Sequence, residues 1–192
     1  SLEEVGKNTF MNCASLESVK LPSSLKAIGS GMFYECAVLK SVEIPSTVTS
    51  IGDEAFLGCT SLTSLNIPAA VEELGTGIIA RSGVATLTID EGNTNFHIED
   101  GVLYSADNRL LYAIPQKGLE EVSVARNCIG INGGAFWGSE IKKVTLPDGF
   151  LAIDAYAFCQ CSLEEINFPS SLLFIGEQGF ASTNLKEVTL PE

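Results

Sequence analysis

The sequence lacks the features by which membrane proteins and nucleic-acid-binding proteins are usually recognised. Although 45% of its 192 residues are hydrophobic, no apolar run approaches the roughly 18 residues that a spanning helix needs, so no membrane span is predicted. Only 11 lysines and arginines stand against 24 acids, which gives a net charge of −13. Because phosphate binding needs a basic stripe, this balance argues against a nucleic-acid partner. It indicates either simple solubility or, as the alternative, a cationic partner.

Residues with catalytic or metal-binding potential are equally scarce. The chain has one histidine, His97, no Cys-x-x-Cys pair and no Gly-x-Ser-x-Gly, Gly-x-Gly-x-x-Gly or Walker-type loop. A triad enzyme would have to use His97, which we interpret as a surface residue. The adjacent acids Asp53-Glu54, Glu72-Glu73 and Glu120-Glu121 are interpreted as residues near the start of short helical segments rather than as a glycosidase pair. We therefore expect no enzyme activity, no cofactor, no metal site and no small-molecule substrate.

What the chain does have is a repeat. The unit Ile-Gly-x-x-Ala-Phe-x-x-Cys recurs with a fixed step of 23 residues in the first half and 22 in the second, measured on its phenylalanine: Phe10, Phe33, Phe56, then Phe136, Phe158, Phe180. Proline keeps the same offset at Pro22, Pro45 and Pro68. A shared period for several residue types is the signature of a solenoid, in which each coil buries its apolar face against the next. We expect the six phenylalanines to stack inside.

Each repeat also carries the pattern apolar-x-x-apolar-x-apolar, which is typical of a leucine-rich repeat, followed in most repeats by a proline that ends the strand. Eight such segments are predicted as short strands: 16–21, 39–44, 62–67, 84–89, 119–124, 141–146, 163–168 and 185–190. The predicted fold is an α/β solenoid: a right-handed leucine-rich-repeat superhelix of about eight coils of 22–23 residues, with a parallel sheet on its concave face.

These motifs resemble the BspA-like family, the Treponema pallidum type of leucine-rich repeat, over nearly the whole chain and almost position by position in residues 28–74. The resemblance implies a bacterial surface protein associated with adhesion. We accordingly expect a single leucine-rich-repeat domain over 1–192, taken from a longer protein, that is extracellular or at the cell surface with its signal sequence removed.

The six cysteines are interpreted mainly as packing residues. Cys13, Cys36, Cys59 and Cys161 share one repeat position, which predicts buried free thiols rather than disulfides. Cys128 replaces an apolar residue of other coils and is also predicted to be buried. Cys159 follows Phe158 and is predicted to face outward, as the one reactive thiol.

One segment breaks the period. Leu74 and Ile131 are 57 residues apart where two coils would take about 45. The excess predicts a β-hairpin insertion over about 95–115, in which the runs 102–104 and 110–112 flank the polar turn 105–109. Either Phe96, Tyr104 and Tyr112 pack this hairpin onto the solenoid, or its tip contacts a ligand. The segment also resembles a recurrent insertion of the BspA-like family, which favours the structural role.

Residues that alternate with the apolar strand positions should face outward as a polar strip. As binding residues we select Glu43, Asn66, Thr88, Glu121, Lys143, Thr145, Glu165, Asn167 and Glu187. The strip has no aromatic platform for sugars and few of the anchors found in protein hot spots. Trp137 lies in the turn segment and is predicted to be the most exposed aromatic residue, either at the core edge or as a contact residue.

Two functions fit these observations. The first, which we expect, is a non-catalytic bacterial cell-surface or secreted leucine-rich-repeat protein that mediates protein-protein interaction or adhesion, with a host or bacterial surface protein as the expected partner. The alternative is a structural spacer that presents another domain at the cell surface.

Overall fold

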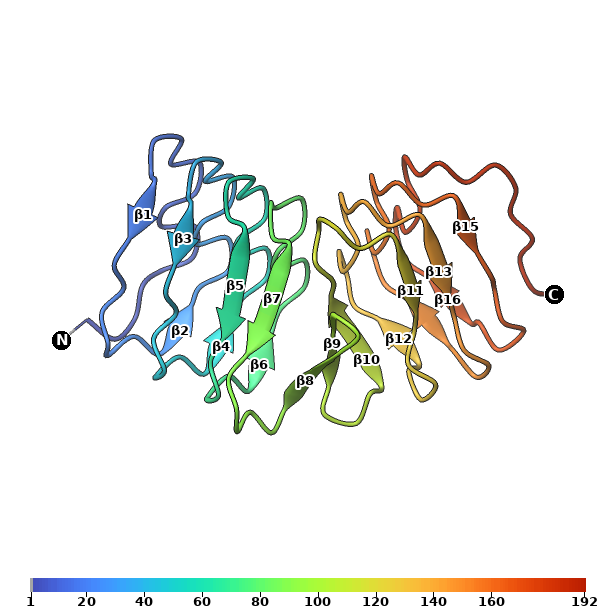
Figure 1. Ribbon diagram of the computed structural model, residues 1–192, viewed down its shortest axis with the longest axis horizontal. Helices are drawn as coiled ribbons and strands as arrows, with labels where there is room; N and C mark the ends of the chain where they lie inside the picture. The colour runs from blue at the N-terminus through green and yellow to red at the C-terminus, as the bar shows by residue number, and fades with distance from the viewer. Residues whose placement is uncertain (1) are drawn as a thin grey trace.

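The structure, a computed structural model, describes residues 2–192. Over these residues the chain forms sixteen short β-strands and no helix (Figure 1). The strands are β1 (Ser18–Val19), β2 (Ala27–Ile28), β3 (Ser41–Val42), β4 (Ser50–Ile51), β5 (Ser64–Ile67), β6 (Glu73–Leu74), β7 (Thr86–Ile89), β8 (Phe96–Glu99), β9 (Val102–Ser105), β10 (Leu110–Ala113), β11 (Glu121–Ser123), β12 (Gly130–Ile131), β13 (Lys143–Thr145), β14 (Ala152–Ile153), β15 (Glu165–Ile166) and β16 (Phe174–Ile175).

Most strands fall into two parallel rows. The first row consists of β1, β3, β5, β7, β11, β13 and β15, and the second row of β2, β4, β6, β10, β12, β14 and β16. Strand pairing joins residues one repeat apart, for example Ser18 with Ser41 and Ile131 with Ile153. Between the rows the chain turns at the prolines, where the amide of Val48 donates to the carbonyl of Pro45 and that of Leu172 to Pro169. The period therefore sets the strand register, and the predicted proline exits are confirmed.

The third side of each coil is a turn unit, defined as the six residues from two before the repeat phenylalanine to three after it. The seven turn units are 8–13, 31–36, 54–59, 77–82, 134–139, 156–161 and 178–183, with Ile79 in place of phenylalanine in the fourth. In every unit the residues two before and two after this position have a positive φ, between 51° and 75°. A right-handed helix does not admit such residues, so the predicted helical segments and the α/β class are wrong.

Neighbouring turn units are joined by a ladder of backbone hydrogen bonds that all run the same way. The amides of Gly31, Phe33 and Glu35 donate to the carbonyls of Asp53, Ala55 and Leu57 in the next coil at 2.7–2.9 Å, Asp53 being the residue just before the next turn unit. The same two or three bonds recur at every junction between consecutive units, from Asn8, Phe10 and Asn12 to Tyr156, Phe158 and Gln160. The stack of turn units therefore has a direction: the bonded N–H groups point toward the C-terminal end of the solenoid.

The repeat phenylalanines pack between the rows as predicted. Ring centroids lie 5.6 Å apart for Phe10 and Phe33, 5.5 Å for Phe33 and Phe56, and 4.5 Å for Phe136 and Phe158. Phe33, Phe56, Phe136 and Phe158 are fully buried, whereas Phe10 and Phe180 are half-buried because each belongs to a terminal coil with a neighbour on one side only. The inward register of the rings is confirmed.

The number of coils differs from the prediction. Seven turn units are present rather than eight coils, and the eighth expected strand, 185–190, forms no strand. Val188 and Leu190 in this segment are more than half exposed. A strand of a solenoid is held by pairing with its neighbours, and β15, the last strand of the first row, pairs with β13 but not with residues 185–190.

The insertion is larger than a hairpin. β8 pairs antiparallel with β9, and β9 antiparallel with β10, so three strands form a meander. β10 then pairs parallel with β12 and thereby restores the second row. The turn between β9 and β10 confirms the predicted hairpin, but β8 was not expected as a strand.

β9 and β10 form a wall between two hydrophobic cores. Leu103 and Ala113 belong to the core of the N-terminal half, whereas Val102, Tyr104 and Leu111 belong to the core of the C-terminal half. All five side chains are at most 2% exposed. Both faces of the hairpin are therefore buried, which supports the structural interpretation of the insertion.

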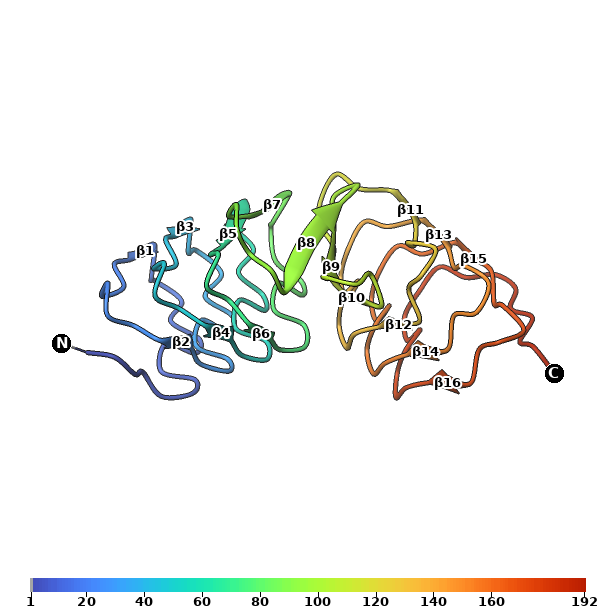
Figure 2. The same ribbon diagram turned by 90° about the horizontal axis from the view of Figure 1, so that it is seen from below.

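The wall also bends the solenoid. On the turn side, residues 56 positions apart are directly bonded, with the amide of Gly77 donating to the carbonyl of Gly133 and that of Arg81 to the carbonyl of Trp137 at 2.8 and 2.9 Å. On the strand side, β7 and β11 lie in different sheets, and the inserted strands occupy the space between the halves. In Figure 2 the first row follows the outer edge of the resulting arch, so the prediction of one concave parallel sheet is wrong.

Replacing Phe56 with alanine should lower the free energy of unfolding by about 3–5 kcal/mol, because the ring is fully buried and its removal leaves a cavity. Urea unfolding followed by circular dichroism measures the change. Phe174→Ala serves as control, since that ring is 53% exposed and its loss should cost less than about 1 kcal/mol. Equal losses for the two variants would contradict the register.

Replacing Tyr104 with phenylalanine should cost about 1–3 kcal/mol, because the hydroxyl accepts the amide hydrogen of Ala125 at 3.1 Å in a buried site. The matched control is Tyr112→Phe, whose hydroxyl has no hydrogen-bond partner among residues 2–192. The control should stay within about 0.5 kcal/mol of the parent protein. A neutral Tyr104→Phe variant would show that the wall does not depend on this bond.

Candidate interaction surface

The polar strip lies on the first row, where alternation places every second side chain in solvent. β5 and β11 show this directly, with an exposed residue between buried ones. Eight of the nine selected residues are exposed, namely Glu43, Asn66, Thr88, Glu121, Thr145, Glu165, Asn167 and Glu187, and Lys143 is partly exposed. The insertion divides these residues into two groups, one on β3 to β7 and one beyond β10.

In the N-terminal part of the strip, a chain of hydrogen bonds links two uncharged side chains to one carboxylate. Thr88 donates from its hydroxyl to Oδ1 of Asn66 at 2.8 Å, and Nδ2 of Asn66 donates to Oδ1 of Asp90 at 2.9 Å. The backbone register between β5 and β7 aligns Asn66 with Thr88. Asp90 follows β7 and was not selected from the sequence, because it lies one residue beyond the predicted strand segment 84–89.

The C-terminal part of the strip is charged. β11, β13 and β15 align Glu121, Lys143 and Glu165 side by side. Nζ of Lys143 donates to both carboxylate oxygens of Glu165 at 3.0 Å, and this bond, more than any other cause, raises the pKa of Lys143. Thr145 lies one position further along β13, opposite Ser123. The result is a row of alternating charge fixed by strand pairing.

Asn167 plays a part that its position alone does not reveal. Its Oδ1 accepts the amide hydrogen of Leu146 at 2.7 Å, and its Nδ2 donates to the carbonyl of Leu146 at 2.9 Å. The side chain thus completes the pairing beyond the ends of β13 and β15. Asn167 is a structural clamp as well as an exposed residue.

Glu187 does not join the array. It is exposed, but the segment around it forms no strand and therefore does not align it with Glu165. The prediction that Glu187 belongs to an ordered strip is wrong for the same reason that the eighth strand is absent.

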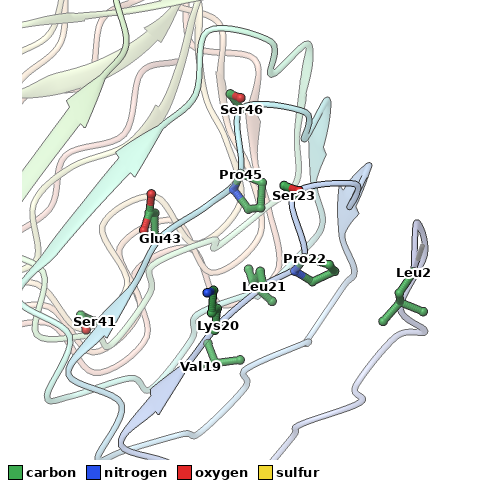
Figure 3. Close-up of a pocket in the computed structure, with 10 residues that line it drawn as sticks. All are labelled: Leu2, Val19, Lys20, Leu21, Pro22, Ser23, Ser41, Glu43, Pro45 and Ser46. Atoms are coloured by element: carbon green, nitrogen blue, oxygen red, sulfur yellow. The ribbon is translucent and has the colours of Figure 1, made fainter.

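Glu43 lies beside a groove that the sequence did not predict. An open groove of about 960 Å³ is lined by the polar residues Lys20, Ser23, Ser41, Glu43 and Ser46 and by Leu2, Val19, Leu21, Pro22 and Pro45. Figure 3 shows Lys20 and Glu43 on adjacent segments, with Leu2 standing apart on a separate segment. The groove joins the strip to the N-terminal end of the solenoid.

The cysteines are free thiols, and five of the six are buried. Cys36 and Cys59 donate from Sγ to the carbonyls of Phe10 and Phe33 at 3.0 and 3.1 Å. Burial raises the pKa of Cys59 to about 12 and that of Cys161 and Cys128 to about 11. Cys13 is only partly buried, because it lies in the first coil.

Cys159 contradicts its prediction. It is 4% exposed rather than outward-facing, and burial raises its pKa, an effect that the charge of Arg81 partly opposes. Alternation of inside and outside holds for strands, but Cys159 lies in a turn unit between residues of positive φ, where that rule does not apply.

The remaining residues singled out from the sequence lie apart from the strip. Trp137 is half-buried and stacks on Tyr156 with centroids 5.3 Å apart, at the core edge on the turn side. His97 lies on β8 with Nε2 3.9 Å from Glu99. Asp53 accepts hydrogen bonds from the amide and hydroxyl of Thr76 in the next coil. Within residues 2–192, no cluster of three or more acidic, histidine or cysteine side chains has a metal-binding arrangement, and no helix is long and apolar enough to cross a membrane.

Stacked coils of 22–23 residues with short parallel strands and a phenylalanine spine define a leucine-rich-repeat solenoid. The sequence matches the family described as BspA type leucine rich repeat region in six copies, over residues 1–106 and 112–192, and the chain belongs to this family. The resemblance drawn from the repeat motifs is confirmed. Among curated proteins there is no match.

Solved structures show the same fold. The leucine rich cell surface protein of Faecalibacterium prausnitzii is 29% identical, with a TM-score of 0.88 over 97% of this chain and 51% of that protein. The pneumococcal vaccine antigen PcpA is 27% identical, with a TM-score of 0.81 over 92% of this chain and 51% of the antigen. The leucine rich repeat protein of T. pallidum, 22% identical with a TM-score of 0.50 over 91% of this chain and 67% of its own, shares the fold alone. The chain therefore spans about half the length of the first two structures.

Alkylation of the native protein at about pH 8 should modify Cys13 first and leave Cys59 and Cys161 unmodified, because only a thiolate reacts and burial keeps those two protonated. Mass spectrometry of the digested protein gives the modification of each site. After unfolding in denaturant without reductant, all six thiols should react. Disulfide-linked peptides, or labelling of native Cys59 as fast as Cys13, would contradict the assignment.

Proposed function

We propose that this chain is a non-catalytic leucine-rich-repeat module, displayed at a bacterial cell surface or secreted, that binds a protein partner through the C-terminal part of the polar strip. The observation that supports this most directly is the row Glu121, Lys143 and Glu165, whose backbone positions are fixed by pairing of β11, β13 and β15. A preformed array loses little conformational entropy on binding, which favours affinity.

The chemistry of the row favours a cationic partner. The chain carries a net charge of −13, and Glu164 and Glu120 stand next to the row in sequence and add exposed acids. Complementary charge of this kind mainly raises the association rate and selects among partners. Solved relatives described as a cell surface protein and a vaccine antigen support placement outside the cell.

The spacer function remains the second candidate, and one observation favours it. Much of the strip's hydrogen-bonding capacity is used within the chain, by Lys143 with Glu165, by Asn167 with the backbone of Leu146, and by Asn66 with Thr88 and Asp90. A surface whose polar groups are already paired offers fewer of them to a partner.

A charge reversal separates the two functions. The double variant Glu121→Lys/Glu165→Lys should weaken binding of a basic extracellular protein by about tenfold or more, since loss of the acids turns attraction into repulsion around Lys143. Binding is measured by biolayer interferometry against a panel of purified basic surface proteins. The effect should shrink as salt is raised, because exposed charges are screened beyond about 10 Å at 0.1 M.

The matched control is Glu72→Lys/Glu73→Lys, which makes the same change in net charge on exposed residues at the second row. It should leave the affinity within about twofold, as expected for charges outside the contact. A partner that tolerates the strip variant, and also tolerates replacement of the hairpin turn 105–109 by a short glycine-serine turn, would rule out the proposed surface. A panel without any binder would favour the spacer.

A further inference from the structure

The last residue of the turn unit changes type on either side of the insertion. Four turn units have cysteine at this position, namely Cys13, Cys36, Cys59 and Cys161. The two units that meet at the bend have serine instead, Ser82 and Ser139, and both side chains are at most 3% exposed. A buried hydroxyl needs hydrogen-bond partners more than a thiol does, because a thiol is a weak donor and a weak acceptor. The exchange therefore places polar groups where the two halves of the solenoid meet.

The two halves move apart along the chain at these serines. On the turn side they are bonded directly as far as the amide of Arg81 and the carbonyl of Trp137, at 2.9 Å. Three residues further along each half, a third segment lies between them. The amide of Gln116 donates to the carbonyl of Val84 at 2.7 Å, and its carbonyl accepts from the amide of Glu140 at 3.2 Å. The serines thus lie where the separation grows from one hydrogen bond to the width of a backbone.

The side chains at this junction have unused hydrogen-bonding capacity. Gln116 is 1% exposed, and its Nε2 donates to the carbonyl of Ile114 at 3.0 Å. Oε1 of Gln116 and Oγ of Ser139 are both buried and have no hydrogen-bond partner among residues 2–192. Oγ of Ser82 accepts from the amide of Val84 at 3.3 Å, which leaves its own hydrogen free to donate. Each of the three segments that meet here therefore contributes one buried polar group that can still form a hydrogen bond.

In regular coils the same position is satisfied by the neighbouring coil. The thiols of Cys36 and Cys59 donate to the carbonyl of the phenylalanine in the preceding coil, at 3.0 and 3.1 Å. Ser139 makes no such bond to Ile79, the equivalent residue of the preceding coil. Unpaired buried polar atoms are rare in folded proteins, and an internal water is the usual partner where protein groups do not reach.

From these observations we propose that one water molecule binds inside the junction and bridges the two halves of the solenoid. It donates one hydrogen to Oε1 of Gln116 and the other to Oγ of Ser139, and it accepts the hydroxyl hydrogen of Ser82. Three hydrogen bonds are typical of a buried water, and here they satisfy all three side chains. The site lies within the solenoid, away from the polar strip, and does not rest on the proposed function.

The segment that carries Gln116 separates the site from solvent. Pro115 and Gln116 are buried, and Glu140 holds the exposed residues that follow them. Its carboxylate accepts hydrogen bonds from the amide of Gly118 and from Nζ of Lys117, both at 3.1 Å. The bound water therefore exchanges with solvent only when this segment or the junction opens.

The sign of one substitution tests the proposal. If the hydroxyl of Ser139 has no partner, Ser139→Ala removes an unpaired polar atom and stabilises the protein. If the hydroxyl binds the water, the same change leaves the water and Gln116 short of a partner, and the equilibrium constant for unfolding should rise by about fivefold or more. Urea unfolding measures this constant. The control is Ser123→Ala, an exposed hydroxyl on β11, which should change it by less than about twofold. A stabilised or unchanged Ser139→Ala variant would overturn the proposal.

A double-mutant cycle tests whether the two side chains share one ligand. Gln116→Leu removes Oε1 together with the bond to Ile114. Its effect on the unfolding constant should be at least about threefold smaller in the Ser139→Ala background than in the parent, because that background has already lost the shared water. Equal factors in both backgrounds would show that the side chains act independently and would rule out a bridging water.

A high-resolution crystal structure of the parent chain gives the direct test and needs no variant. We expect an ordered water within hydrogen-bond distance of Oε1 of Gln116 and Oγ of Ser139. A direct hydrogen bond between these two side chains, or no water between them, would overturn the proposal.

Discussion

The structure depends on one arrangement of the backbone, the pair of positive-φ residues that flank each inward ring. Without them the amides on either side of the ring would not point along the solenoid axis, and the turn units could not bond to one another. Left-handed geometry costs a residue other than glycine roughly 1–2 kcal/mol, which is of the same order as the net gain from one hydrogen bond. The hydrogen bonds between turn units therefore add little net stability by themselves. They persist because the phenylalanine rings and the strands of the same coils bury apolar surface at the same time.

Side chains at these positions follow a pattern that spans coils. Gly58 and Gly138 have positive φ, and a Cβ at either would come within 2.7 Å of a side chain from the preceding coil, Glu35 or Arg81 respectively. Each glycine thus makes room for a longer side chain to lie across it. Glu35 reaches over the third coil to bond Arg81 of the fourth at 3.0 Å. At this repeat position, the glycine of one coil provides the space that the long side chain of the preceding coil occupies.

Much of the architecture follows from the period alone. The spacing of phenylalanine and proline predicts the strands, the exits from them and the stacked rings, because each depends on contacts between equivalent residues of adjacent coils. The absence of helices was not predicted, since acids at the start of a segment suit a helix and a turn equally well. The eighth strand was wrong because the apolar pattern of 185–190 does not reveal that this segment fails to pair with β15, and the prediction for Cys159 was wrong because alternation is a property of strands.

For the candidate surface, the sequence predicted which side chains are exposed but not how they bond to one another. Alternation correctly places Asn66, Lys143 and Glu165 outside, but it does not show that their polar groups bond one another, since that depends on strand pairing across coils. The bend of the solenoid at the insertion could not be predicted from the sequence for a similar reason. It arises because Gly77 and Gly133 meet across an insertion, and no local pattern relates two residues so far apart.

The wall formed by β9 and β10 has a consequence for how the molecule unfolds. In a solenoid, stability is close to a sum of coil terms and nearest-neighbour terms, so an array can melt from its ends or break at its weakest junction. Here one hairpin supplies side chains to both cores, and the halves are also joined directly on the turn side. Unfolding of the N-terminal half would expose Leu103 and Ala113, and unfolding of the C-terminal half would expose Tyr104 and Leu111. Neither half can therefore unfold without exposing apolar side chains of the wall that the other half needs. The insertion therefore couples two short stacks into one cooperative unit, in which slow amide exchange should centre on the middle of the chain and decrease toward both ends.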